Sequence, residues 1–497
     1  MGEARQGGRP LVFEVGAPGL RVGVLSERLD VPVVEPAEAF GPAARAEPPM
    51  LPHATEGQLA RHYARLAAVN FGVDTGFYPL GSCTMKHNPR VSEDAARLPG
   101  FAAVHPYQPA STVQGALGLM HALQGVLAEV SGLPGVTLQP SAGAHGELTA
   151  LLVFRAAHGQ RGDATSRRCV LVPDTAHGTN PASVAMAGWE VRQVPTDGRG
   201  NIDLGELRSA LGPHVAAVML TNPNTLGLFE ERILEVTASA HRAGAFVYCD
   251  GANLNAILGK ARPGDMGFDA LHVNLHKTFA TPHGGGGPGS GPVCVSAELA
   301  PYLPAPVVAE VEGGGYGLVE PERTIGRVRS FLGNFGVAVR AYAYALALGS
   351  EGLEEVAEQA VLSANYLKER LKVAYDLPYD RTCMHEFVLS GRRQRRRAGI
   401  RALDIAKRLL DFGFHPPTVY FPLVVEEALM IEPTETEDPD TLDAFAEAML
   451  RIAREAEEEP EVLRSAPHAT PVRRLDEVRA ARRPDLRWRR VRARGGG

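Results

Sequence analysis

Short apolar segments alternate with amphipathic stretches through the middle of the chain. Most of these segments are apolar on both faces, as expected of strands that helices cover from both sides. They occupy residues 169–173, 191–195, 215–221, 245–250, 271–276 and 293–296. Between two of them, residues 230–243 have helical periodicity and stop at Gly244. This βαβ rhythm predicts a mainly parallel sheet with helices on its faces.

The flanking regions have other patterns. Residues 111–130 place apolar side chains on one helical face, with Ser111 or Thr112 as the expected N-cap and Gly132 as the stop. A longer helix is predicted after Gly336, leading into a second domain. There we expect strands at 385–390 and 419–425, a basic loop at 392–397, and helices near 403–410 and 440–457.

These patterns divide the 497 residues into four expected regions, and the length itself exceeds one small core. Residues 1–75 form an N-terminal arm rich in Pro, Gly and Ala, with a helix near 56–69. Residues 76–335 form the large domain and 336–470 the smaller C-terminal α/β domain. An Arg-rich tail with little to bury occupies 471–497.

Composition narrows the function classes. A formal net charge of −6 gives no general attraction to nucleic acid or anionic membranes. No apolar run approaches the roughly 18 residues of a membrane span, and no apolar segment follows the first arginines as in a secretory signal. The five cysteines are scattered, without metal-ligand spacing or a disulfide framework. We therefore expect a reduced, cytoplasmic compartment.

Lysine is scarce, and one lysine has an informative position. Only six of the 51 Lys and Arg residues are lysines. An apolar strand delivers Lys277 into a loop, and the glycine-rich segment 284–291 follows. This arrangement favours a Schiff-base lysine at the carboxyl edge of the sheet, with glycines that let backbone approach a bulky cofactor. For a lone lysine, an exposed side chain before a flexible loop is the commoner outcome.

An acidic residue ends the preceding strand. Asp250 lies 27 residues before Lys277 and is followed by Gly251 and Ala252. An acid in this position can pair with a protonated pyridine nitrogen and keep the ring able to accept electrons. For a lone acid in this position, a helix cap or a solvated loop acid is the commoner outcome. Strand–Asp followed by strand–Lys is a rarer combination, which favours pyridoxal phosphate (PLP).

Three further turns carry polar or small residues at strand ends or a helix start. Residues 141–147 suit an anion site at a helix N-terminus, although they match neither the Walker nor the dinucleotide pattern. His177 could stack on a cofactor ring or exchange a proton near neutral pH. Asn222 could donate to a phenolic oxygen. The simpler alternatives are a capped helix, a loop histidine bonded to backbone, and a turn.

Long motifs along the chain resemble a known family. They resemble subunit 2 of the two-chain bacterial form of the glycine-cleavage decarboxylase, or P-protein, family. The likeness covers roughly residues 50 to 490. It is carried by FYPLGSCTMKHNP (77–89), QPSAGAHGE (139–147), AHGTNPA (176–182), TNPNTLG (221–227), DGAN (250–253), residues 274–291, FGFHPPTVYFPLVV (412–425) and IEPTETE (431–437).

The resemblance implies a fold and a set of cofactor contacts. The family has the fold-type-I PLP architecture, an α/β fold with a large, mostly parallel seven-stranded sheet domain and a smaller C-terminal α/β domain. It implies that Lys277 forms the Schiff base with PLP and that Asp250 holds the ring nitrogen. His177 is then expected to stack on the ring, with Ala252 on its other face. The implied phosphate ligands are Ser141, Ala142, Gly143 and His276.

The resemblance also implies a reaction and partners. Glycine loses CO2, and its aminomethyl group is transferred to the lipoyl arm of H-protein, so no NAD site is needed in this chain. Single-chain members of the family are about twice as long and have two homologous halves. The half present here therefore implies a catalytically silent subunit 1 and an α2β2 heterotetramer. The alternatives are another fold-type-I PLP enzyme, such as an aminotransferase or amino-acid decarboxylase, and a non-catalytic scaffold, against which Lys277 and Asp250 argue.

Some assignments stay open at the level of sequence. The substrate carboxylate could be bound by Arg327, Arg329, or a backbone or asparagine group. Cys83 is either redox-sensitive or an inert buried thiol. The Arg-rich tail is expected to lie solvated on the surface, because its basic run has no interleaved aromatic beyond Trp488 and therefore does not favour nucleic acid.

Overall fold

The computed structural model describes residues 9–16, 34–47, 49, 51–283 and 289–486. Residues 284–288 of the glycine-rich segment and 487–497 of the Arg-rich tail, including Trp488, lie outside the described residues. The chain separates into two compact units. One is Val73–Ala466, and the other combines Met1–Gly72 with Pro467–Gly497.

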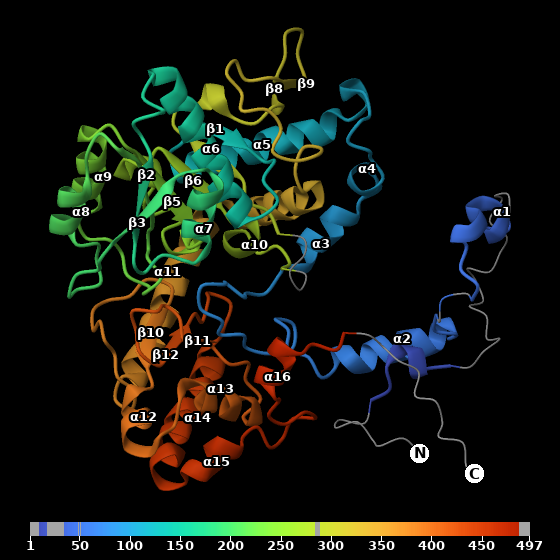
Figure 1. Ribbon diagram of the computed structural model, residues 1–497, viewed down its shortest axis with the longest axis vertical. Helices are drawn as coiled ribbons and strands as arrows, with labels where there is room; N and C mark the ends of the chain where they lie inside the picture. The colour runs from blue at the N-terminus through green and yellow to red at the C-terminus, as the bar shows by residue number, and fades with distance from the viewer. Residues whose placement is uncertain (1–8, 17–33, 48, 50, 284–288, 487–497) are drawn as a thin grey trace. The chain divides into compact units, whose positions relative to one another are not determined.

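A seven-stranded sheet is the centre of the Val73–Ala466 unit (Figure 1). Its strand order is β1-β7-β6-β5-β4-β2-β3. Strand β7 is antiparallel to β1 and β6, and the other neighbouring pairs are parallel. The predicted mostly parallel sheet is thus confirmed. The strands are β1 Gly135–Thr137, β2 Cys169–Pro173, β3 Glu190–Val194, β4 Val215–Thr221, β5 Phe246–Gly251, β6 Ala270–Val273 and β7 Val293–Val295.

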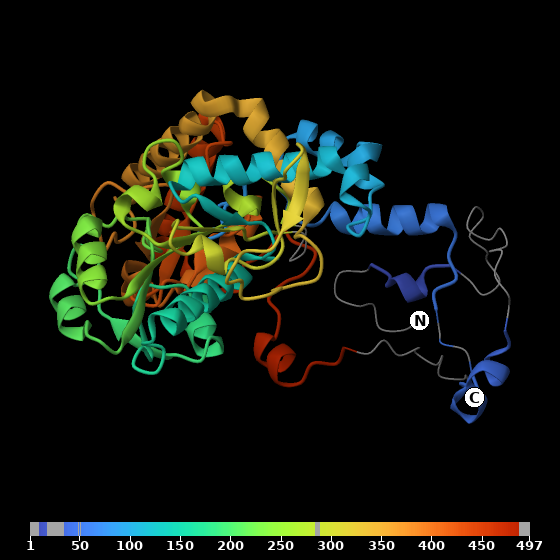
Figure 2. The same ribbon diagram turned by 90° about the horizontal axis from the view of Figure 1, so that it is seen from above.

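Helices cover both faces of this sheet (Figure 2). Alternate residues of one strand enter different cores: Val218 packs with one layer of helices and Met219 with the other. This explains why the central strands are apolar at every position. The first layer contains α5 Gln114–Ser131, α8 Leu204–Ala210, α9 Ile233–Arg242 and the start of α11 Phe335–Leu371. The second contains α6 Gly143–Arg161 and α7 Thr179–Met186.

A smaller antiparallel sheet has its own hydrophobic core. Its order is β10-β12-β11, with Phe387 of β10 paired to Ile431 of β12. The long helix α11 passes from the large sheet to this smaller one (Figure 1). The elements are β10 Phe387–Ser390, α12 Arg392–Ala398, α13 Ala402–Asp411, β11 Thr418–Val419, β12 Ala428–Ile431, α14 Pro439–Glu458 and α15 Pro460–Ser465.

Three further segments of the same unit surround these sheets. Helix α3, Arg90–Arg97, packs on α11 and is followed by the single turn α4, Pro99–Ala102. A separate hairpin is formed by β8 Val307–Glu310 and β9 Tyr316–Val319. The loop at residues 77–89 is mostly irregular, but Leu80 makes an isolated antiparallel bridge to Ile431.

Several local expectations were wrong. Residues 392–397 are helical, because arginine is a good helix former and Gln394 turns inward and is buried. Of the strand expected at 419–425, only Val419 pairs, as the second residue of β11, since Pro422 lacks an N–H for the ladder. The strand expected at 271–276 ends at Val273, where the chain enters a short helix. Ser111 and Thr112 form a 3-10 turn instead of an N-cap.

The Met1–Gly72 and Pro467–Gly497 unit has little regular structure among its described residues. It contains α1 Pro36–Phe40, α2 Glu56–Ala67 and α16 Glu477–Arg482. A capping box starts α2, in which Thr55 and Gln58 exchange side-chain and backbone hydrogen bonds. Helix α16 buries no side chain, as expected of the tail. Among the described residues of both units, no helix combines the length and apolarity needed to cross a membrane.

Candidate active site

A cavity of about 590 Å³ opens at the carboxyl edge of the large sheet. Segments that follow β4, β5 and β6 meet there with the start of α6 and with Ser82 from the loop at 77–89. This is where open α/β sheets place their ligands. The lining residues are Ser82, Gly143, Ala144, Glu147, His177, Thr179, Thr221, Thr225, Asp250, Ala252, Asn253, His272, Asn274, His276 and Lys277.

Lys277 enters the cavity from α10, Leu275–Thr278, the single helical turn that follows β6. The residue is only 9% exposed, and its Nζ donates a 2.8 Å hydrogen bond to the carbonyl of Ser82. Ser82 has a φ of 64°, a left-handed conformation that is uncommon for a residue other than glycine. The amine is therefore held at a fixed point of the cavity wall.

Asp250 lies near the end of β5 and is 4% exposed. Its carboxylate accepts hydrogen bonds from Asn180 Nδ2 at 3.0 Å and from the Ala252 N–H at 3.1 Å. Burial alone would raise the pKa of Asp250, but the neighbouring His272 and these hydrogen bonds outweigh burial and lower it. The carboxylate is consequently ionised and oriented, as pairing with a cationic ring nitrogen requires.

His272 supports Asp250 from the adjacent strand, and the sequence analysis did not single it out. The β5–β6 register places His272 directly beside Asp250, with His272 Nε2 3.5 Å from Asp250 Oδ1. The Tyr248 hydroxyl hydrogen-bonds to His272 Nδ1. Burial holds the pKa of Tyr248 well above its ordinary value, so the phenol keeps its proton and can donate it to Nδ1. That leaves Nε2–H facing the carboxylate.

The start of α6 forms another wall. Its N-cap, Ala142, has no capping side chain, so the first N–H groups of this 19-residue helix have no side-chain cap. A Cβ atom on Gly143 would lie 2.6 Å from Asn274 Nδ2 and 2.9 Å from His272 Nε2, so only glycine fits. His276 lies nearby; burial, with His283 and Lys277, lowers its pKa to about 3. This wall suits an anion bound by N–H groups.

Two further polar residues, Thr221 at the end of β4 and Glu147 on α6, complete the cavity wall. The Thr221 hydroxyl is buried in the cavity wall without a hydrogen-bond partner. Glu147 accepts hydrogen bonds from Thr179 Oγ1 at 2.7 Å and Ser183 Oγ at 2.8 Å. Neither Thr221 nor Glu147 was expected as a site residue, although both belong to motifs noted in the sequence. An unpartnered buried hydroxyl is an available contact for a polar ligand atom.

The structure brings six of the nine expected cofactor residues to the cavity wall: Lys277, Asp250, Ala252, His177, Gly143 and His276. The His177 ring is exposed, with Nδ1 2.9 Å from Thr179 Oγ1.

Ser141, Ala142 and Asn222 are not among the described lining residues. Ser141 uses its backbone locally, its N–H donating to His145 Nδ1 and its carbonyl accepting from Asn334 Nδ2. Asn222 accepts a hydrogen bond from the Glu230 N–H at 3.0 Å, and its Nδ2 lies 3.7 Å from Met266 Sδ. The Asn222 side chain is therefore used in the fold, and the neighbouring Thr221 faces the cavity in its place.

The residues whose roles the sequence did not decide, Arg327, Arg329 and Cys83, also lie outside the described cavity wall. Arg329 Nη1 donates to Asn334 Oδ1 at 2.7 Å, and Arg327 is exposed. Cys83 Sγ lies 3.4 Å from His283 Nδ1, and burial raises the pKa of the thiol. A raised pKa keeps Cys83 in its less reactive thiol form, which supports the inert alternative.

The cavity matches the functional groups of PLP one by one. Lys277 offers an amine for the aldehyde, and Asp250 offers an ionised acid for the ring nitrogen. The first turn of α6 and His276 suit a phosphate, and the unpartnered Thr221 hydroxyl is available to another polar atom of the ring. The described residues thus fit the cofactor.

Comparisons with known proteins agree with this geometry. A family model described as "Glycine dehydrogenase, C-terminal domain" matches residues 356–468, and one described as "Aminotransferase class-V" matches residues 152–298. The protein from Halalkalibacterium halodurans named "Probable glycine dehydrogenase (decarboxylating) subunit 2" is 60% identical, over 97% of this chain and 98% of its own. One of the same name from Desulforamulus reducens is 57% identical, over 96% of this chain and 99% of its own.

Solved structures show the same fold. A glycine decarboxylase (P-protein) of the glycine cleavage system, in inhibitor-bound form, matches with a TM-score of 0.69 and 26% identity. The match covers 84% of this chain and 93% of that one. A NifS-like protein matches with a TM-score of 0.59 at 16% identity, a likeness of fold alone.

Proposed function

Because the chain belongs to the glycine dehydrogenase (decarboxylating) subunit 2 family, we propose that it decarboxylates glycine with PLP in the glycine cleavage system. The observation that carries the proposal is that the Lys277 amine and the ionised Asp250 carboxylate line the same cavity. In the net reaction, the carboxylate of glycine leaves as CO2 and its methylene carbon bonds to one lipoyl sulfur. The S–S bond breaks, and the second sulfur takes up a proton.

Asp250 and its supports set the charge of the site. When bound, PLP supplies an aldehyde for an amine and a cationic ring that accepts the electron pair left by CO2. Asp250 keeps the ring nitrogen protonated by pairing with it. Asn180, Ala252 and His272 hold this carboxylate in place through the contacts described above. Lys277 would hold the cofactor through its amine, the group whose place the amino group of glycine would take.

The remaining cavity residues orient the cofactor. Backbone N–H groups at the start of α6, from Gly143 onward, would bind the phosphate, with His276 beside it. Ser141 and Ala142 would hold this turn in place, since the Ser141 N–H already donates to His145. His177 would stack on one face of the ring and Ala252 would pack on the other, since both line the cavity. Thr221, in place of Asn222, would donate its unpartnered hydroxyl to the phenolic oxygen.

The partners follow from the family. A chain of the subunit 2 type implies a subunit 1. We assign the second substrate to the lipoyl arm of H-protein and the assembly to an α2β2 heterotetramer. Because the complete enzyme also contains subunit 1, the reaction is tested on the assembled protein.

Exchange of label between bicarbonate and glycine tests this function. The assembly of this chain, subunit 1 and lipoylated H-protein, loaded with PLP, is expected to incorporate labelled bicarbonate into the glycine carboxyl group. Lys277→Ala should abolish exchange, whereas Lys407→Ala, at a half-buried lysine outside the cavity wall, should retain it. Wild-type protein that holds its cofactor but shows no exchange, or that transaminates glycine instead, would refute the glycine assignment.

A further inference from the structure

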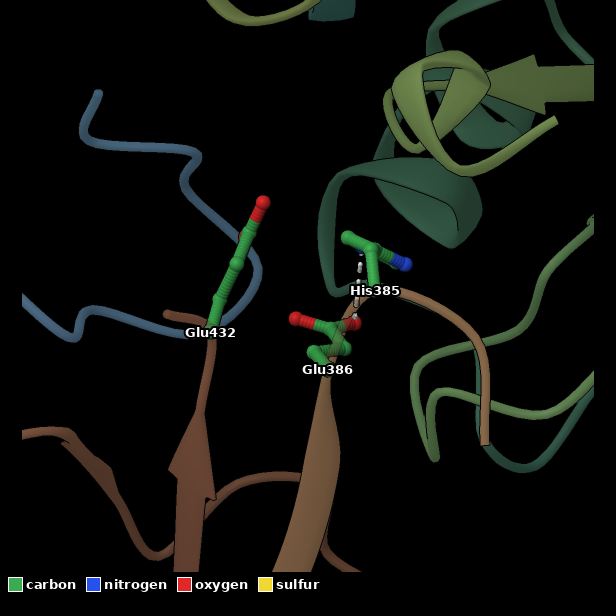
Figure 3. Close-up of side chains that lie close together, drawn as sticks. All are labelled: His385, Glu386 and Glu432. Atoms are coloured by element: carbon green, nitrogen blue, oxygen red, sulfur yellow. Dashed lines mark ion pairs between the residues drawn. The ribbon is translucent and has the colours of Figure 1, made fainter. Parts of the chain in front are cut away.

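A second buried polar cluster lies at the head of the small sheet, outside the cavity wall. It consists of His385, Glu386 and Glu432, which Figure 3 shows at the ends of β10 and β12. The pairing of Phe387 with Ile431 explains why the two glutamates lie close together. Glu386 directly precedes Phe387 and Glu432 directly follows Ile431, so both stand at the same end of the antiparallel strand pair. His385 and Glu386 are 0% exposed and Glu432 is 1% exposed.

Each carboxylate is anchored by one oxygen and presents the other. Glu386 Oε2 accepts from the Ser82 N–H at 2.7 Å, and Glu432 Oε1 accepts from Thr84 Oγ1 at 2.5 Å and Asn255 Nδ2 at 3.4 Å. Glu386 Oε1 and Glu432 Oε2 have no hydrogen-bond partner. Buried oxygens left in this way are costly unless a ligand satisfies them.

His385 gives a second indication of a bound ligand, separate from the two glutamates. Both of its ring nitrogens are buried without a hydrogen-bond partner. Its Nε2 is 3.7 Å from Glu386 Oε1, too long for a hydrogen bond. Both nitrogens are thus available to a ligand, and one of them lies within 4.8 Å of an oxygen of each glutamate. Neutral imidazole is the form that binds metals.

Nearby cations do not balance the two carboxylates. Lys86 Nζ is 2.6 Å from Glu435 and also donates to Tyr344 and to the Thr278 carbonyl. The Lys277 amine points to the Ser82 carbonyl and is assigned to the cofactor. Burial raises the pKa of both Glu386 and Glu432, so without a cation these carboxyl groups hold their protons more tightly than usual. A dication bound between them would displace those protons and be held by the carboxylates.

We propose that His385, Glu386 and Glu432 bind one divalent metal ion of the class that accepts both imidazole and carboxylate, Zn²⁺ or Mn²⁺. One ligand atom from each side chain lies within 4.8 Å of the others. Ligands at about 2.0–2.2 Å from a common ion require such convergence, with small side-chain shifts. Three protein ligands leave the remaining coordination positions to water.

The ion would position the lysine without touching substrate. Ser82 connects the two sites, since its N–H donates to Glu386 and its carbonyl accepts from Lys277. Thr84, two residues further, donates to Glu432. An ion bound to Glu386 and Glu432 would therefore fix the ends of β10 and β12. These ends hold the turn at Ser82 through the two hydrogen bonds. This inference stands on the cluster alone and is independent of the glycine reaction.

Metal binding is tested on the PLP-loaded assembly with subunit 1, free of affinity tags and treated with a chelator. Titration with Zn²⁺ or Mn²⁺, followed by calorimetry and elemental analysis after desalting, is expected to give one tightly held ion per chain. His385→Gln and Glu432→Gln should lose that ion. Glu437→Gln, a half-buried glutamate of the same segment outside the cluster, should keep it. A wild-type protein that retains neither metal, or a His385→Gln variant that binds like wild type, overturns the proposal.

Crystallography covers the case in which the variants do not fold. Wild-type crystals soaked in Zn²⁺ should give an anomalous peak at the zinc edge between His385, Glu386 and Glu432. Thermal unfolding of the wild-type assembly should shift upward with Zn²⁺, because the ion binds the folded state. Ordered water without an anomalous peak in these crystals would contradict the metal site.

Discussion

At the scale of single residues, the site depends on how Asp250 is held. Its neighbours place three donors around the carboxylate: the Asn180 amide, the Ala252 N–H and His272 Nε2. The Tyr248 hydroxyl fixes the tautomer of His272 from behind. This buried hydrogen-bond network holds the negative charge of Asp250 in position for the ring nitrogen, where water does not screen it.

Asp250→Asn should weaken cofactor binding. The amide has the same shape but cannot supply a negative charge to a protonated ring nitrogen. A hydrogen bond to a charged group contributes about 1.5–3 kcal/mol, so we expect the dissociation constant of PLP to rise about 10- to 150-fold. Absorbance titration of the cofactor-free protein measures it. Asp265→Asn, at an exposed ion pair with Arg262, is the control. Equal affinities of Asp250→Asn and wild type would remove Asp250 from the site.

The sequence identified site residues that stand at the ends of predicted strands. It missed residues that reach the site only through the pairing of one strand with its neighbour. Asp250 lies near the end of a strand and Lys277 follows one, so their place at the sheet edge could be predicted. His272 was missed because only the β5–β6 pairing puts it beside Asp250. Asn222 was chosen over Thr221 because a strand that is buried on both faces does not indicate which end residue turns inward.

At the scale of elements, long α/β segments were predictable and short polar elements were not. The ranges of β2 and β4 agree with the apolar runs, because strands covered on both faces leave a continuous apolar signal. Helix α12 was taken for a loop, since its arginines form ion pairs with residues distant in sequence, among them Asp376 and Glu457. Such partners are set by tertiary structure and leave no local pattern.

Helix α3 is attached to α11 by a bidentate ion pair whose strength should depend on pH. Glu93 Oε1 and Oε2 lie 2.8 and 3.0 Å from Arg340 Nε and Nη2. The hydrogen bonds from Arg340 lower the pKa of Glu93. A lowered carboxyl pKa stabilises the fold above the ordinary glutamate range, and the gain is lost as pH falls through the folded-state value.

Glu93→Gln should therefore reduce stability near neutral pH by about 0.2–1 kcal/mol, the range of partly exposed ion pairs. In acid, below the folded-state pKa, variant and wild type should be equally stable. Urea unfolding at both pH values measures the difference, with the exposed neighbour Asp94→Asn as the control. A deficit of Glu93→Gln that persists unchanged in acid would contradict the assignment.

Helix α6 is held to the sheet by aromatic packing. Phe154 is fully buried and stacks on Phe246 of β5, with ring centroids 4.8 Å apart. Phe154→Ala should cost about 3–5 kcal/mol, from lost burial and the cavity left behind. Phe154→Leu should cost less. Denaturant unfolding of both variants measures the costs, and a loss below about 1 kcal/mol for Phe154→Ala would show that this contact does not secure α6.

At the scale of the whole molecule, the chain carries the lysine site but implies a second polypeptide. The relatives that it matches along nearly all of their length are named as subunit 2. The Val73–Ala466 unit contains the large sheet, the small sheet and every described residue of the cavity wall. Formation of the cavity is thus explained within this chain, whereas the full activity is a property of the assembly.

The α2β2 assembly predicts a defined mass. Mixing this chain with subunit 1 should give a complex of two copies of each by size-exclusion chromatography with light scattering. Each copy of this chain contributes 53.0 kDa. A one-to-one complex that does not dimerise at micromolar concentration would contradict the proposed stoichiometry, while leaving the site in this chain unaffected.

The central claim is that Lys277 holds the cofactor opposite Asp250. The most direct test is borohydride reduction of the PLP-loaded protein, followed by peptide mapping. We expect loss of the visible absorbance and one pyridoxyl group per chain, on Lys277. Label on any of the other five lysines, or no covalent label on a protein that retains the cofactor, would contradict it.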